Sequence, residues 1–334
     1  MGRYITRRIL WMFVVLFSVS LITFALQHAV PGGPFDREKK LPREIIANME
    51  AKYHLNDPLW KQYVDYMADI LVPRITTTDE VPSLLTDSLF KVDIGDTRIR
   101  IMNWGPSYAS RSRTVNDVFR EQLPISAQLG VQALIIAVLI GIPLGILSAL
   151  RQNTWPDYLG MGIAIFGVSV PVIVLGPIMI WLFAVSLRWF PATGWGDLDQ
   201  MVMPSVALGL ASSALIARLT RASLLQVIRE DYIRTARAKG LGERAVIVGH
   251  ALKNSMIPVV TILGPLFAGL TTGTFITEQI FGIPGMGKHF ITSIGNRDYP
   301  VIMGTTLLYA IFLVVANLAV DITYAWLDPR IRYT

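Results

Sequence analysis

Long apolar runs alternate with polar segments along this chain of 334 residues. A helix needs about 20 mostly apolar residues to cross the hydrocarbon core of a membrane. Runs of that length recur through the sequence and predict an all-α polytopic membrane protein with six transmembrane helices. The predicted spans are residues 9–30, 123–150, 158–187, 201–221, 255–277 and 301–325.

The first span follows a basic tail and is similar in that respect to a signal peptide. Its apolar run is longer than the roughly 7–15 residues of a signal-peptide core, and no small-residue cleavage site follows it. We therefore expect it to be retained as the first helix.

Basic residues beside the spans predict the orientation, because loops rich in Lys and Arg stay in the cytoplasm. The N-terminal tail is basic, and so is the connection between Arg218 and Lys253. The connection 188–200 has more acidic than basic residues, which suits the outer side. An even number of spans then returns the C-terminus, with Arg330 and Arg332, to the cytoplasm.

The spans divide the chain into three regions. Residues 1–30 hold the N-terminal tail and the first helix, and residues 31–122 form an extracytoplasmic lobe. Residues 123–334 form the core domain with helices 2–6, including a cytoplasmic loop at about 222–254.

The lobe is the one sizeable aqueous element that the pattern predicts. A polar helix is expected over about 41–70, followed by short β-like or irregular pieces from Pro73 to Thr114. The apolar content of the segment is too low for an independent core. Its role is either a docking surface for an external partner or a plain spacer or cap. The helical spacing rests on Leu41, Ile45, Met49 and Tyr53.

Composition supports lipid as the main solvent. Only 16% of residues are charged and the mean hydropathy is +0.48, whereas soluble domains carry about 25% charged residues. The chain has no cysteine, which excludes disulfides, thiol catalysis and cysteine metal sites. The net charge of +6 follows from the basic loops, so we expect no nucleic-acid partner.

The predicted spans carry no ionisable residue near their middle. Because such residues mark proton relays and ion sites, their absence argues against a proton-coupled carrier. No nucleophile with a base and no metal-ligand set is visible, so we expect no catalytic residue and no metal site. The nearest ionisable residues are His28, Arg151, Arg218, Glu278 and Asp321.

Small and neutral polar residues occur inside the spans instead. Two G-x-x-x-G patterns, starting at Gly141 and Gly269, favour close helix packing. The closely packed helices could also shift against one another and line a pathway, and the two interpretations are compatible. Gln128 and Gln132 lie one helical turn apart. They are candidates for a pathway lining, and interhelical hydrogen bonding is the alternative.

The basic cytoplasmic loop has an amphipathic pattern from Ser223 to Ala238, which predicts one helix. Gly240 suits the end of that helix, and Glu243–Leu252 predicts a second short helix running into the fifth span. Two short helices at an angle would form an elbow that a partner protein contacts. The alternative is that the segment lies as a helix on the membrane surface. The apolar face is Leu224, Val227, Ile228, Tyr232, Thr235 and Ala236.

This loop resembles the "EAA" loop of ABC-importer permeases, whose pattern is Glu-Ala-Ala, three residues, then Gly. Here it reads Arg234-Thr-Ala, three residues, Gly240, with the Glu and the first Ala replaced and the following proline, Pro258, placed later. The dipeptide/oligopeptide/nickel branch has the pattern Tyr-x-Arg-Thr-Ala-Arg-Ala-Lys-Gly, which stands here at 232–240. The resemblance covers about 1–35 and 104–334, and segment 66–103 is longer than usual. Further matching motifs are at 4–10, 31–32, 104–108, 114–115, 278–287 and 297–300.

The resemblance implies an ABC importer type I permease fold in a prokaryotic plasma (inner) membrane. It implies a homologous second permease subunit, two ABC ATPase subunits and an extracytoplasmic substrate-binding protein as partners, besides membrane lipid. ATP and Mg would bind the partner ATPase and this chain would bind no cofactor, so the chain itself is not expected to be an enzyme. The implied substrate is a di- or oligopeptide; a nickel chelate, a glutathione-like compound or an oligosaccharide is the alternative. The residues implied in ATPase coupling are Tyr232, Arg234, Thr235, Ala236, Arg237, Lys239 and Gly240.

A stand-alone secondary carrier or channel is the alternative class. In the importer interpretation, a structured extracytoplasmic hairpin follows the fifth span, near the face that docks a binding protein. It also holds a near match to a phosphate loop at 282–289, but His289 replaces the hydroxyl residue and nucleotide binding is not expected. A myristoylation pattern at 1–6 would be redundant beside a spanning helix. The hairpin residues are Glu278, Phe281, Pro284, Gly285, Gly287, Arg297 and Asp298.

Overall fold

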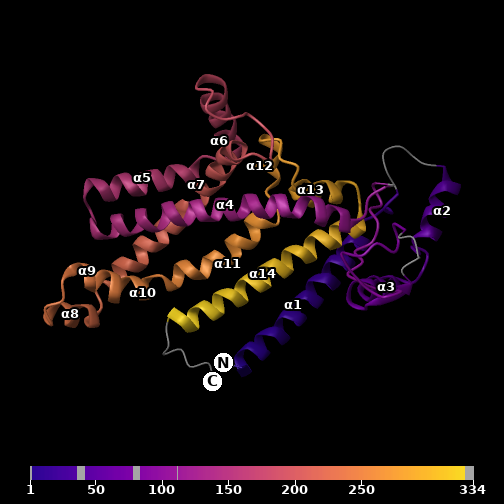
Figure 1. The fold of residues 1–334 in the computed structure, drawn as a ribbon, viewed down its shortest axis with the longest axis horizontal. Coiled ribbons are helices and arrows are strands. Elements are labelled where there is room, and N and C mark those ends of the chain that lie inside the picture. The colour runs from indigo at the N-terminus through magenta and orange to yellow at the C-terminus, as the bar shows by residue number, and fades with distance from the viewer. Residues whose placement is uncertain (1, 36–41, 78–82, 111, 328–334) are drawn as a thin grey trace. The chain divides into compact units, whose positions relative to one another are not determined.

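The computed structural model describes residues 2–35, 42–77, 83–110 and 112–327. Most of the described chain is helical, and one three-stranded sheet is present (Figure 1). The described residues form two compact units. The membrane unit holds residues 2–10, 126–284 and 312–327, and the lobe unit holds residues 11–125 and 285–311.

Four helices of the described chain are individually long and apolar enough to cross a membrane. They are α1 (Gly2–Ala29), α4 (Val115–Leu150), α7 (Leu198–Val227) and α14 (Tyr299–Leu327). They confirm the first, second, fourth and sixth predicted spans. Arg330, Arg332 and Met1 lie outside the described residues, so the predictions that used them stay predictions.

The third predicted span is broken rather than continuous. Helix α5 (Trp155–Ser169) meets α6 (Val172–Met179) and the π-helix η1 (Ile180–Ser186) at an angle of 101°. Pro171 disfavours a helical conformation for the residue before it, and Val170 is extended, with φ −92° and ψ 109°. The proline was visible in the sequence, but the angle of the break was not.

The fifth span is bent as well. Short helices α9 (Glu243–Ala245), η2 (Val246–Ala251) and α10 (Leu252–Ser255) lead to α11 (Ile257–Thr271) with a bend of 49°. This confirms a short helix that runs into the fifth span. The span ends at Thr271 rather than at the predicted residue 277, and a separate helix, α12 (Phe275–Ile280), follows it.

Glycines bring helices of the membrane unit into backbone contact. A Cβ on Gly141 would lie 2.7 Å from the carbonyl oxygen of Ser213, and one on Gly145 would lie 2.6 Å from that of Ala217. This G-x-x-x-G pattern therefore packs α4 against α7. The pattern at Gly269 differs, because a Cβ built there meets no atom of another described helix within 4 Å.

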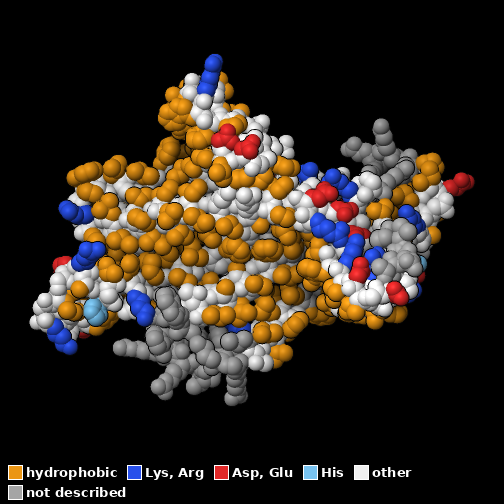
Figure 2. Space-filling view, in the orientation of Figure 1, with side chains coloured by type: hydrophobic (Ala, Val, Ile, Leu, Met, Phe, Trp, Pro, Cys, Tyr) orange, Lys and Arg blue, Asp and Glu red, His pale blue; other side chains and the backbone are white. Residues whose placement is uncertain are grey.

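The surface of the membrane unit is largely apolar. Figure 2 shows hydrophobic side chains covering α4, α5 and α11, and Leu139, Phe166 and Trp181 are each more than 60% exposed. So much exposed apolar surface is not stable in water. It identifies these helices as lipid-facing or partner-facing. Within the same unit, Arg8 of α1 forms an ion pair with the buried Asp321 of α14, with 2.6 Å between Nε and Oδ2.

The lobe unit combines helices with a small sheet. Its helices are α2 (Arg43–Lys52), α3 (Leu59–Leu71) and α13 (Gly287–Gly295), and its strands are β1 (Arg74–Thr77), β2 (Phe90–Ile94) and β3 (Thr97–Ile101). Both strand pairs are antiparallel in the order β1-β3-β2, in agreement with the β-like pieces predicted after Pro73.

The single helix predicted over 41–70 is wrong, because the described chain has two helices with a turn between them. His54 adopts a left-handed conformation with φ +56°, and Pro58 caps α3 in place of continuing α2. Leu41, the first residue of the predicted pattern, lies outside the described residues.

The core of the lobe unit draws on more than residues 31–122. Trp104 and Phe119 pack edge to face, with ring centroids 5.4 Å apart, and Val115 is fully buried. A Cβ on Gly304 of α14 would lie 2.6 Å from Val115. Residues 31–122 have a low apolar content, and part of α14 adds to their core. This part of α14 lies outside the residue range predicted for the lobe.

Candidate functional site

Helix α8 (Asp231–Ala238) carries the motif that the sequence singled out. It lies with α9 at one end of the membrane unit, next to α10 in Figure 1. The helix predicted over Ser223–Ala238 is interrupted. Helix α7 ends at Val227, and Ile228 begins a turn whose extended Glu230 caps α8. The predicted amphipathic face is accordingly divided between two helices.

Two side chains of α8 anchor it. Ile233 is fully buried and Ala236 is 7% exposed. They join a hydrophobic cluster with the ends of α4 and α7 and with both ends of η2. Displacing α8 would therefore displace these helix ends with it. The other members of the cluster are Ala149, Leu224, Val246 and Ala251.

The opposite face of α8 is exposed. Tyr232 is 41% exposed and its hydroxyl accepts a hydrogen bond from Asn254 Nδ2 at 2.8 Å. Arg234 and Thr235 are exposed, while Ala236 faces the chain's own core. The sequence had grouped Tyr232, Thr235 and Ala236 on one apolar face; the structure instead buries Ile233, an isolated apolar residue in a basic helix.

The end of α8 is built by Gly240. Its φ of +80° is readily adopted only by glycine, and nothing lies within 4 Å of a Cβ built there. Lys239 caps the helix and is exposed. Arg237 closes the elbow toward α9, because its Nε donates to Glu243 Oε1 at 2.7 Å and its Nη2 donates to Oε2 at 3.2 Å.

A buried ion pair joins the start of α5 to α7, and no motif in the sequence indicated it. Asp157, in the first turn of α5, is 2% exposed and accepts two hydrogen bonds of 2.7 Å from Arg221 of α7. It also accepts a bond of 3.0 Å from the backbone N–H of Asn153. A lone Asp at the edge of an apolar run was the only available signal.

Gln128 and Gln132 make contacts between α4 and α7. Their Nε2 atoms lie 3.6 and 3.3 Å from Met201 Sδ, and Ser205 Oγ donates to Gln132 Oε1 at 2.8 Å. These contacts fit the alternative of interhelical hydrogen bonding. A pathway role for the pair stays a prediction.

The segment predicted as a hairpin forms α12 and α13, joined by residues 281–286. Helix α12 precedes the glycine-rich turn, whereas a phosphate loop follows a strand. In the membrane unit, Glu278 is buried and its Oε1 accepts from Ser126 Oγ at 2.8 Å. Phe281 is 1% exposed, and its carbonyl accepts from Gly194 at 3.0 Å, while Pro284 is exposed.

The remaining hairpin residues belong to the lobe unit. Gly285 and Gly287 are buried around the start of α13. Arg297 Nη1 donates to the Gly33 carbonyl at 3.4 Å. Asp298 is 3% exposed and accepts hydrogen bonds from Ser107 Oγ and from the backbone N–H groups of residues 108 and 109, at 2.9 and 3.1 Å.

Replacing Asp298 with alanine is expected to loosen residues 107–109, because three donors lose a buried charged acceptor. The expected cost is about 3 kcal/mol, since hydrogen bonds to charged groups contribute roughly 1.5–3 kcal/mol each and part of the loss is recovered by water. Limited proteolysis of the purified chain should show faster cleavage in this segment. Asp96→Ala, at the exposed turn between β2 and β3, is the control; equal protection of both variants would contradict the prediction.

The fold matches solved ABC-importer structures. The inward-facing MetNI methionine ABC transporter aligns with a TM-score of 0.51 and 18% identity, covering 63% of this chain and 96% of that chain. The described chain thus has the ABC importer type I fold. Residues 141–333 match the family described as binding-protein-dependent transport system inner membrane component, and residues 1–86 match its N-terminal region.

The chain belongs to this family of inner membrane transport components, and its relatives extend over its full length. The dipeptide transport system permease protein DppB of Bacillus subtilis (strain 168) is 41% identical over 332 residues, covering 99% of this chain and 98% of the relative. The oligopeptide transport system permease protein OppB of Salmonella typhimurium is 41% identical over 335 residues and covers all of both chains. The protein is therefore a multi-pass permease subunit of an ABC importer.

Proposed function

We propose that this permease imports di- or oligopeptides and that α8 couples it to a separate ATPase. The arrangement of α8 carries the coupling proposal: one face is buried against α4, α7 and η2 through Ile233 and Ala236, and the other face is exposed and basic. A helix that is both anchored and exposed can pass a partner's movement to the membrane helices.

In this proposal the partner ATPase subunits bind and hydrolyse ATP. Closure of two ATPase subunits would displace α8 in each of two permease subunits, and the helix ends anchored with it would switch the pathway from inward- to outward-facing. Tyr232, Arg234, Thr235 and Lys239 supply the contact surface. Ala236 acts differently from the sequence expectation, since its small side chain serves the packing of α8 on its own chain.

The partners and the orientation follow from the same proposal. A homologous second permease, two ABC ATPases that bind ATP and Mg, and an extracytoplasmic binding protein complete the transporter. Both termini and α8 face the cytoplasm, because the basic loops do. The peptide substrate is supported by the names of the two relatives, which describe dipeptide and oligopeptide systems.

Affinity purification from the native membrane tests this assembly. We expect an ATPase with Walker motifs to purify with the chain in near-stoichiometric amount and to depend on the exposed face of α8. Reconstituted complex should take up dialanine only with ATP and the binding protein. A chain that purifies alone and moves solute without ATP would instead establish a stand-alone carrier.

Replacing Gly240 with glutamate is expected to uncouple transport without preventing membrane insertion. The left-handed backbone costs a non-glycine residue about 1 kcal/mol, which a folded chain tolerates, and the new side chain meets open space within the chain. It would, however, place a negative charge on the basic surface that contacts the ATPase in this proposal. Gly240→Asn, which tolerates this backbone better, is the matched control. Normal ATP-driven uptake by Gly240→Glu would count against the coupling role.

A further inference from the structure

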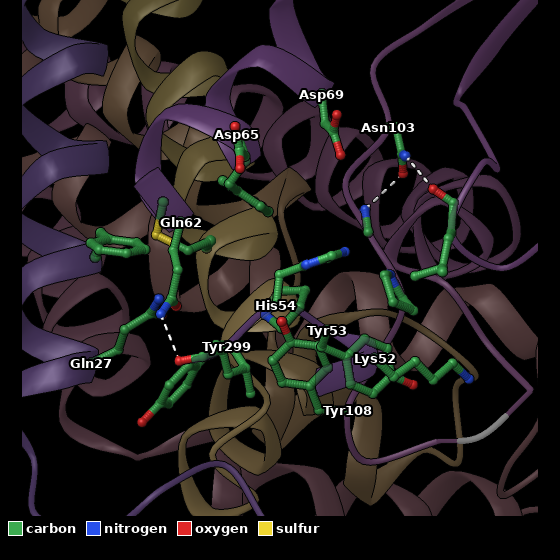
Figure 3. Close-up of a pocket in the computed structure, with 18 of the residues that line it drawn as sticks. Gln27, Lys52, Tyr53, His54, Gln62, Asp65, Asp69, Asn103, Tyr108 and Tyr299 are labelled. Carbon is green, nitrogen blue, oxygen red and sulfur yellow. Dashed lines mark hydrogen bonds between the residues drawn. The ribbon is translucent and has the colours of Figure 1, made fainter. Parts of the chain in front are cut away.

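The lobe unit encloses a cavity of about 340 Å³, and much of its polar lining is engaged by the chain itself. Figure 3 shows the side chains of Gln62 and Asn103, each of which donates to a backbone carbonyl oxygen, at 2.9 and 2.7 Å. The carboxylate of Asp69 pairs with the guanidinium of Arg74, which lines the same cavity. We therefore assign no ligand to this cavity.

An open pocket of about 380 Å³ lies in the membrane unit, where α4 and α7 end beside the elbow of α8 and α9. Its walls are the end of α4, the turn over residues 151–154, the end of α7 and single residues of α8, α9 and η2. Small-molecule sites span roughly 300–1,000 Å³. The pocket is therefore large enough for a phosphate-bearing headgroup.

The pocket carries an excess of positive charge. Arg237 is paired with Glu243, and both line the pocket. Arg151 and Arg229 line it as well, and no carboxylate of the described chain forms an ion pair with either of them. The contact of Arg229 is with the neutral amide oxygen of Gln152, at 3.4 Å. Two guanidinium groups at one pocket thus lack a counter-charge, which favours an anionic ligand.

Apolar side chains adjoin these two arginines. Leu150 lines the pocket and is 43% exposed, and Leu147, on the preceding turn of α4, is 46% exposed. The partly buried side chains of Leu225, Ile228 and Ile247 complete this wall. A ligand that is anionic at one end and apolar at the other would cover both kinds of surface.

Aromatic side chains mark the same end of the unit as a boundary between membrane and water. Trp155 and Tyr158, in the first turn of α5 directly after the pocket wall, are 74% and 68% exposed. Such residues collect where lipid headgroups meet the hydrocarbon core. Figure 2 shows basic side chains where the apolar surface of α4 and α5 meets the elbow. The pocket therefore lies at headgroup level.

We propose that this pocket binds the headgroup of an anionic phospholipid. Arg151 and Arg229 hold the phosphate, because guanidinium groups bind phosphate oxygens through paired N–H donors, and the acyl chains begin along Leu147 and Leu150. Basic pockets between membrane helices bind anionic headgroups in this way. A zwitterionic lipid would bring its own cation toward the two arginines. The cytoplasmic leaflet rests on the proposed orientation, whereas the lipid chemistry rests on the pocket alone.

Mass spectrometry of the intact full chain, purified in detergent, tests the choice of lipid. The chain is mixed with dioleoylphosphatidylglycerol or with dioleoylphosphatidylcholine. We expect one phosphatidylglycerol to bind at least about tenfold more tightly than phosphatidylcholine, as for hydrogen bonds between charged groups. Glycerol 1-phosphate, which has the phosphate without acyl chains, should not displace it at millimolar concentration. Equal binding of the two lipids, or displacement by glycerol 1-phosphate, would overturn the proposal.

A double variant and a matched control separate a defined site from general attraction to a basic surface. Arg151→Gln with Arg229→Gln should abolish the preference for phosphatidylglycerol. Its melting temperature in detergent without lipid should equal that of wild type, since neither arginine has an ion pair in the described chain. Arg244→Gln, at an exposed position of α9 outside the pocket, should keep the preference. An equal loss in both variants contradicts a defined site.

Purification with the ATPase distinguishes failure of this inference from failure of the proposed function. If the two arginines instead bind an acidic side chain of the ATPase, the double variant loses the ATPase and wild-type chain shows no preference for phosphatidylglycerol. That result would overturn the lipid site alone. Preference for phosphatidylglycerol in a chain that purifies without any ATPase would support the lipid site and contradict the coupling proposal.

Discussion

Replacing Ile233 with alanine should release α8 from its anchorage and reduce transport at least about tenfold while the chain remains in the membrane. Ile233 is fully buried in the cluster that joins α8 to α4, α7 and η2. Truncating a buried Ile costs about 2–5 kcal/mol. A loss near 3 kcal/mol changes the ratio of docked to undocked α8 by about a hundredfold.

The measurement is ATP-driven dialanine uptake into proteoliposomes that hold the complete transporter, with the amount of inserted chain determined in parallel. Uptake should fall at least about tenfold at equal insertion, because an undocked helix no longer moves the membrane helices. Val248→Ala, in η2 and 60% exposed, is the matched control and should transport normally. Unchanged uptake with Ile233→Ala would show that the cluster does not carry the coupling.

Replacing Asp157 with alanine is expected to destabilise the membrane unit by about 3–5 kcal/mol, because it leaves a partly buried Arg221 without its partner. Asp157 has a side chain only 3% exposed, and that of Arg221 is 26% exposed. The substitution also removes the carboxylate that accepts a hydrogen bond from the backbone N–H of Asn153, in the turn after α4.

The double variant Asp157→Leu with Arg221→Met tests whether the loss comes from the unpaired charge. A hydrophobic pair of similar volume is often as stable as a buried ion pair, so the double variant should recover most of the thermal stability. Arg229→Ala is the control, since its contact with Gln152 is exposed and 3.4 Å long. A single Asp157→Ala variant as stable as wild type would contradict the structural role of the pair.

The membrane spans show which features hydrophobic periodicity can predict. A run of apolar residues is a local property, so the four long helices follow from the sequence. Pro171 disfavours a helical conformation for the residue before it, yet the 101° bend there depends on what packs around it. In the same way, one helix was expected over 223–238, because an amphipathic pattern cannot show the turn at 228–230.

The site residues show the same limit. The motif at 232–240 located α8 and its glycine stop, and the departure of Gly240 to positive φ agrees with the role expected of it. Which side chains face outward was not readable from the motif. Ala236 turned inward with Ile233, since the cluster offered by α4, α7 and η2 is assembled from segments distant in the chain.

The order of apolar runs by itself indicated a polytopic membrane protein, because lipid solvation acts residue by residue, and the basic loops predicted its orientation. The motif at 232–240 added the resemblance to importer permeases. Only the tertiary structure decided which polar groups meet. The Asp157–Arg221 pair and the loop held by Asp298 join residues from separate segments. Hydrogen bonds and burial depend on distance in space, which a linear pattern does not contain.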